Sequence, residues 1–134
     1  MNTTRFLASG NRGCAGLLPA VNESLAPVNK VNFMKMAHGD VRGLRDLAFE
    51  YFNDTRRLMT VWLAMIDACD FTSLRQELHR CKGGASLFGL ERIVAIIGET
   101  EKPMTLERNG FDLTRFEEEL TAAESVVLEM TETD

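Results

Sequence analysis

Apolar residues in this chain recur at alternating intervals of three and four positions, and this spacing constrains the fold more than any other feature of the sequence. Such a period places the apolar side chains along one face of an α-helix. Runs of alternating β-branched residues, which are typical of strands, do not occur. The pattern predicts helices over about residues 30–37, 41–68, 74–88, 90–97 and 113–130.

The same pattern predicts which residues the long helix buries and where the later helices begin. The expected buried stripe of the long helix consists of Leu44, Ala48, Tyr51, Thr55, Leu58, Trp62 and Met65. Short polar side chains that can accept a backbone N–H bond precede the later helices. The capping candidates are Asp70, Thr72, the capping-box pair Ser73 and Gln76, and the pair Thr114 and Glu117. The stretch 103–110, which begins with proline, is expected to be a turn.

Four amphipathic helices joined by short turns bury their apolar faces best as an antiparallel bundle. We therefore predict an all-α fold, an antiparallel four-helix bundle with a short additional N-terminal helix or arm. A chain of 134 residues has the length of one domain. Residues 1–27 are rich in glycine and proline and have weak periodicity, so they are expected to form the arm, and residues 28–134 the bundle.

Composition excludes several functional classes. The chain has 15 basic and 20 acidic residues, a net charge of −5, which argues against a nucleic-acid partner. The longest apolar run, residues 61–66, is far shorter than the roughly 20 residues that span a membrane. The N-terminus lacks the apolar stretch of a signal peptide, so we expect a cytoplasmic location. Cys14, Cys69 and Cys81 are odd in number and widely spaced, which favours reduced thiols without a bound metal.

One segment, residues 78–89, departs from the helical pattern that surrounds it. Gly83 and Gly84 lie together inside this pattern, where each glycine costs about 1 kcal/mol relative to alanine. A glycine pair can simply mark the end of a helix, but apolar residues continue at helical spacing on both sides. Local rules that are broken in this way tend to mark functional or strained sites.

Helical geometry places the polar residues of this segment on one exposed strip. At about 100° per residue, His79 points about 140° from the centre of the apolar stripe, and Gly83 about 180°. Arg75, Lys82 and Ser86 lie about 80–120° from that centre, on the same flank as His79. Because Gly83 faces outward, it does not serve packing within the bundle. A glycine there leaves space for a partner that approaches from outside.

The residue types on this strip suit phosphoryl transfer. A neutral imidazole can attack a phosphoryl group and hold it as a phosphoramidate, and Lys82 can balance charge on the phosphoryl oxygens. Arg75 and Lys82 give the strip two positive charges, which suit an anionic ligand or an acidic partner. No phosphate-binding glycine loop occurs, so the donor's catalytic groups are expected on another protein. The simpler interpretation, an ordinary surface histidine, applies to most exposed histidines.

The segment resembles the histidine-containing phosphotransfer (HPt) domain family. That family has a histidine, a Lys-Gly pair three and four residues later, and a glycine ten residues later. The corresponding residues here are His79, Lys82, Gly83 and Gly89. The Leu-Glu pair that typically ends the family's next helix is replaced by Thr100-Glu101, so the leucine is missing. The resemblance covers about residues 28–131.

The resemblance implies a phosphorelay function. His79 would be the phosphoacceptor, Lys82 would support the phosphoryl group, and Gly83 would leave room for a receiver domain. That receiver would belong to a response regulator or a hybrid histidine kinase, and Arg75 and Ser86 would join Gly83 in binding it. The protein would be a phosphocarrier without kinase activity of its own. We expect a monomer that needs no cofactor.

Three alternatives remain open from the sequence. Lys82-Gly83-Gly84 and Phe88-Gly89 also resemble the phosphoacceptor domain of chemotaxis-type histidine kinases. A non-catalytic helical interaction module could retain the motif by descent. A metal- or ligand-binding bundle could use His79 and Cys81, but these side chains point about 160° apart on a helix, which prevents joint coordination.

Overall fold

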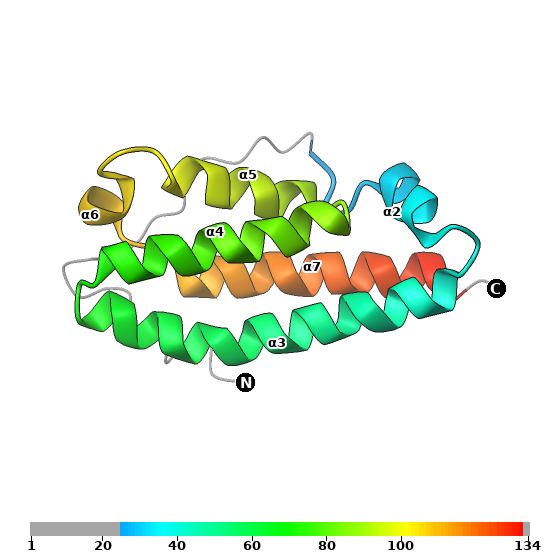
Figure 1. The fold of residues 1–134 in the computed structure, drawn as a ribbon, viewed down its shortest axis with the longest axis horizontal. Coiled ribbons are helices and arrows are strands. Elements are labelled where there is room, and N and C mark those ends of the chain that lie inside the picture. Colours follow the sequence, from blue (N-terminus) through cyan, green and yellow to red (C-terminus); the bar gives the residue numbers. More distant parts are fainter. Residues whose placement is uncertain (1–24, 133–134) are drawn as a thin grey trace.

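The computed structural model describes residues 25–132, and every regular element in that range is an α-helix (Figure 1). This confirms the predicted all-α fold. The helices are α2 (Lys30–Ala37), α3 (Val41–Asp67), α4 (Phe71–Leu87), α5 (Glu91–Thr100), α6 (Thr105–Asn109) and α7 (Leu113–Thr131). Residues 1–24 of the predicted arm, which comprises residues 1–27, lie outside the described range.

Four of the helices enclose the apolar core. Helix α3 packs against α4 and α7, and α5 packs against the same two helices. Neighbouring helices in this group run in opposite directions (Figure 1). Helix α2 contacts α3 at one end of the molecule, and α6 lies at the other end against α4 and α5. The ends of α5 and α6 therefore lie beside the first half of α4.

Aspartates fix the starts of the long helices. Asp70 accepts a hydrogen bond from the backbone N–H of Ser73 and caps α4, so one of the three capping candidates is confirmed. Helix α7 begins differently from the prediction. Its cap is Asp112, which accepts from the N–H of Arg115, whereas Thr114 was predicted to cap. Both aspartates lie one residue before the first helical residue, where a carboxylate satisfies an otherwise unpaired donor.

The buried face of α3 is rotated relative to the prediction. Leu58 is 41% exposed, and Tyr51 and Met65 are only partly buried. Their sequence neighbours take their places in the core. The fully buried face consists of Leu44, Ala48, Phe52, Thr55, Met59, Trp62 and Ile66. At positions 51/52, 58/59 and 65/66 both residues are apolar, so the sequence does not distinguish the two faces. Packing against α4 and α7 decides which face is buried.

The connection between α5 and α7 is more ordered than the predicted turn. It contains the short helix α6, entered at Met104 with a φ of 65° and left at Gly110 with a φ of 68°. Leu106 of α6 is completely buried, so burial of one apolar side chain stabilises this turn of helix. Within residues 25–132, no helix is both long and apolar enough to span a membrane.

Candidate functional site

His79 lies in the middle of α4 with its side chain 72% exposed. Its neighbours on the inner face, Leu78 and Cys81, are buried in the core. Gly83 lies one turn further along on the outer face, where an added Cβ would meet no atom within 4 Å. The structure therefore places the imidazole beside open surface, as the helical geometry predicted.

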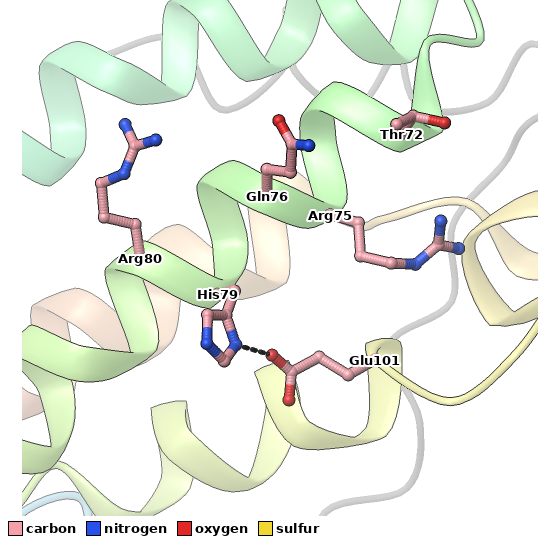
Figure 2. A pocket seen from close by; sticks show the side chains of 6 residues that line it. All are labelled: Thr72, Arg75, Gln76, His79, Arg80 and Glu101. Carbon is pink, nitrogen blue, oxygen red and sulfur yellow. Dashed lines mark hydrogen bonds and ion pairs between the residues drawn. The ribbon is translucent and has the colours of Figure 1, made fainter.

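Glu101 holds the imidazole from the end of α5. Its Oε2 atom lies 2.6 Å from Nδ1 of His79, across 22 residues of sequence (Figure 2). With Glu101 ionised, this contact requires the ring proton on Nδ1, because a carboxylate only accepts hydrogen bonds. The lone pair of the neutral ring then lies on Nε2. That atom faces away from Glu101 (Figure 2).

The same carboxylate also binds Lys82. The Nζ atom of Lys82 donates to Oε1 of Glu101 over 2.5 Å, so Glu101 joins the imidazole and the ammonium. Partial burial of Glu101 opposes its ionisation, but the hydrogen bonds from Lys82 and His79 outweigh that effect. They hold the pKa of Glu101 below its usual range. Glu101 is therefore a carboxylate at neutral pH, as the Nδ1–H arrangement requires.

Arg75, four residues before His79, is paired with α6. Its guanidinium donates to Oε1 of Glu107 over 2.8 Å. A backbone hydrogen bond and then the bond from Arg75 lower the pKa of Glu107. The two positive charges expected on the strip are thus present, but each has a carboxylate partner from the segment 101–107.

An open pocket of about 710 Å³ lies beside these side chains. Its lining residues are Thr72, Arg75, Gln76, His79, Arg80 and Glu101 (Figure 2). Arg75 and His79 project on the side of α4 that faces Glu101, whereas Arg80 projects away from Glu101.

The two adjacent glycines have different surroundings. Gly83 faces open space, but a Cβ on Gly84 would lie within 2.8 Å of Cδ1 of Tyr51. Tyr51 crosses from α3, and its hydroxyl donates to the backbone carbonyl of Cys81 over 2.7 Å. Burial raises the pKa of the Cys81 thiol, which also contacts the Tyr51 hydroxyl. Gly84 therefore permits close packing inside the bundle.

The glycine that follows α4 permits a backbone turn and a close approach. Gly89 has a φ of 73°, which favours glycine over other residues. Its carbonyl accepts from the N–H of Asn29 over 2.7 Å, and a Cβ at position 89 would lie 3.1 Å from the Asn29 carbonyl oxygen. Gly89 therefore ends α4 and lets the chain pass close to Asn29.

Sequence reasoning missed Glu101 and Glu107 as parts of the site. Neither residue shows a periodicity signal, and both approach α4 only through the fold. The one available signal for Glu101 was its place in the family pattern, where it matches the glutamate of the Leu-Glu pair. Ser86 is exposed on α4, and it lines a separate pocket with residues of α5 and Leu25. It does not line the pocket beside His79 and Glu101.

The alternative metal site finds no support in the described part of the chain. Residues 25–132 contain no group of three or more histidine, cysteine, aspartate or glutamate side chains that could hold a metal ion. Cys81 is 7% exposed and faces the core, whereas His79 faces outward.

Comparison with protein families gives one clear result. A family model described as the Hpt domain matches residues 33–126, which is more than half of the 134-residue chain. The matched range begins in α2 and ends in α7, so it includes His79 and both glutamates that support the site. No curated protein and no solved structure matches the chain.

Proposed function

This chain belongs to the Hpt domain family, and from that premise we propose that it carries phosphoryl groups on His79 in a two-component phosphorelay. It would take the group from an aspartyl phosphate on one receiver domain and deliver it to another. The observation that carries this proposal is the 2.6 Å contact between Nδ1 of the exposed His79 and Glu101. This contact presents the opposite ring nitrogen, Nε2, to an incoming group.

The proposed reaction is a direct displacement at phosphorus. The Nε2 lone pair forms an N–P bond while the P–O bond to the receiver's aspartate breaks, and that electron pair leaves on the aspartate carboxylate. The ring then carries a positive charge. Because the Nδ1 proton lies against Glu101, this charge is stabilised without any movement of the ring. Delivery to a second receiver is the reverse reaction.

Lys82 supports the phosphoryl group in this proposal. Its ammonium lies three residues after His79 on the helix surface, within the distance at which side chains of one helix interact. In the free protein this ammonium is bound to Glu101, the same carboxylate that contacts Nδ1 of His79. The negative charge on the phosphoryl oxygens attracts the ammonium, so Lys82 would favour the phosphoryl-bound state.

The surface around His79 suits a receiver domain. Gly83 on α4 and Gly98 on α5 both face open space, since an added Cβ at either position would touch nothing. Arg75 and Ser86 lie at the two ends of the exposed strip of α4 and would contact the partner. We further propose that the protein is a monomeric phosphocarrier without kinase activity that acts in the cytoplasm, where Cys69 and Cys81 stay reduced.

A direct transfer assay tests the function. A receiver domain labelled with radioactive phosphate is mixed with the protein, and the label on the protein is tested for acid lability and stability in base. The chain has one other histidine, His38, which serves as the control. We expect such a label on the natural protein and on His38→Gln, and none on His79→Gln. His79→Gln should retain its helical circular dichroism because the side chain is exposed. Undiminished labelling of a folded His79→Gln variant would overturn the assignment.

The donor in that assay also separates the relay from the related kinase domains. Labelling by a phosphorylated receiver supports the relay. A protein that takes label only from ATP and the ATP-binding domain of a chemotaxis-type kinase would instead be the phosphoacceptor domain of such a kinase. A protein that takes label from neither donor nor from a small phosphoryl donor would be an interaction module.

A further inference from the structure

We propose that Arg75 is a second phosphoryl-binding residue, and that Glu107 restrains it until His79 is phosphorylated. This inference rests on the proposed function of His79. It assigns a role to the ion pair between α4 and α6 that the transfer reaction itself does not use. The pair joins Arg75 and Glu107 over 2.8 Å, at the edge of the pocket that His79 also lines.

Arg75 and Lys82 flank His79 on the same helix. Arg75 precedes it by four residues and Lys82 follows it by three, and both spacings bring side chains together on a helix surface. Arg75 and His79 project toward the same side of α4 (Figure 2). Both side chains line one pocket, so a phosphoryl group that His79 holds in this pocket would have the Arg75 guanidinium at its border.

The charge of the phosphorylated state calls for a second cation. A phosphoryl group brings about 1.5–2 negative charges and three acceptor oxygens. It would be attached to a ring that already contacts the carboxylate of Glu101. Together with the Glu101 carboxylate, the site would then hold about three negative charges, of which the positive ring and Lys82 offset two, so about one is left without a partner. Arg75 can supply this charge, and its guanidinium can donate two parallel hydrogen bonds to phosphoryl oxygens.

In the unphosphorylated protein, Glu107 competes for the same guanidinium. The side chains of Arg75 and Glu107 are 32% and 33% exposed, so solvent screens this pair and makes it weak. A doubly charged phosphoryl group nearby is the stronger partner. Phosphorylation would therefore exchange one ion pair for another, and would release the ion pair that links α4 to α6.

Arg80 provides a matched control within the same pocket. It is adjacent to His79 in sequence and also lines the pocket, but it projects away from Glu101 (Figure 2). It is bound to Glu77 on its own helix over 3.1 Å. Arg80→Gln therefore removes the same charge from the same pocket, one residue from His79, without removing the proposed contact.

The test uses phosphoramidate as the donor, so no partner protein is needed. Nε2 attacks its phosphorus, the P–N bond of the reagent breaks, and ammonia leaves. The rate of phosphohistidine formation is measured by ³¹P NMR for the natural protein, Arg75→Gln, Glu107→Gln, the double variant and Arg80→Gln. Circular dichroism and urea unfolding check that each variant is folded.

The proposal predicts opposite effects for the two members of the pair. Arg75→Gln should slow phosphorylation about tenfold, which corresponds to about 1.4 kcal/mol. Glu107→Gln should accelerate it about two- to threefold, because a weak restraint is removed. The double variant should react like Arg75→Gln, since Glu107 acts only through Arg75. Arg80→Gln should react like the natural protein.

Three results would overturn this inference while His79 still takes the label. They are an unchanged rate in Arg75→Gln, a slower rate in Glu107→Gln, and an equal loss in Arg80→Gln and Arg75→Gln. A slower Glu107→Gln would mean that the ion pair positions Arg75 rather than restraining it. Failure of the natural protein to form phosphohistidine would instead overturn the proposed function.

Discussion

The aromatic ring of Tyr51 occupies the space that a side chain at position 84 would need. A Cβ there would lie 2.8 Å from Cδ1 of the ring and closer still to Cε1. The ring reaches this position because its hydroxyl bonds to the Cys81 carbonyl on the far side of α4 from His79. The helix that carries His79 therefore has one glycine that faces open space and one that faces its neighbour α3.

Alanine substitutions at these two glycines should change stability in opposite directions. Gly83→Ala should stabilise the protein by about 0.5–1 kcal/mol, because alanine favours the helix and meets no neighbour. Gly84→Ala gains the same helix propensity, but displacing Tyr51 should cost about 1–3 kcal/mol. Urea unfolding of the two variants measures the difference. Equal shifts of the two midpoints would contradict the different roles of the glycines.

A large side chain at position 83 should slow phosphoryl transfer from a receiver domain and leave the reactivity of His79 toward a small donor unchanged. Gly83→Gln should slow transfer from a phosphorylated receiver at least tenfold, since it fills the open surface beside His79. The same variant should react with phosphoramidate at the natural rate. Comparing the two donors in parallel measures this selectivity. A loss of reactivity with both donors would show that Gly83 matters for the histidine itself.

Loss of the ammonium beside His79 should slow phosphoryl transfer. A lost charge-assisted contact is worth about 1.5–3 kcal/mol, so Lys82→Ala should react about ten- to a hundredfold more slowly. Folding stability should change by about 1 kcal/mol, because the variant loses one partly exposed ion pair with Glu101. Quench-flow transfer from a receiver, with receiver affinity measured separately, tests this. A loss of affinity in proportion to the rate would make Lys82 a docking residue.

Removing the charge of Glu101 should impair the nucleophile. In Glu101→Gln the neutral amide no longer favours the proton on Nδ1, nor the positive ring that forms on attack, so labelling should slow at least tenfold. Glu99→Gln is the matched control. It removes a carboxylate two residues earlier on α5 that pairs with Lys102 rather than with α4. Equal rates in both variants would remove Glu101 from the mechanism.

The stabilising effect of Glu101 should disappear in acid. Its pKa in the folded protein is lowered, so its ionisation stabilises the fold above the usual carboxyl range. This contribution is lost as the pH falls through the lowered pKa, because the unfolded chain binds the proton more readily. The free energy of unfolding of the natural protein should exceed that of Glu101→Gln by about 0.2–1 kcal/mol near pH 6. The difference should be smaller at pH 3. Urea unfolding at both pH values measures the change, and a constant difference would contradict it.

The sequence alone determined the helical fold and the orientation of the exposed strip. Helical period, the capping aspartate Asp70 and the requirement for short turns are local properties, so they predicted the positions of α2, α3, α4, α5 and α7. The outward directions of His79 and Gly83 follow from their angle to the apolar residues of the same helix. That argument needs no knowledge of the neighbouring helices.

The tertiary structure decided everything that depends on a second element. It selected Phe52, Met59 and Ile66 over their neighbours for the core of α3, because both candidate faces are apolar and only packing distinguishes them. It also explains the glycine at position 84, because the Tyr51 ring occupies the space that a Cβ there would need. It also brought Glu101 and Glu107 to α4 from 19 or more residues away, since a carboxylate selects its partner by spatial distance and not by sequence interval.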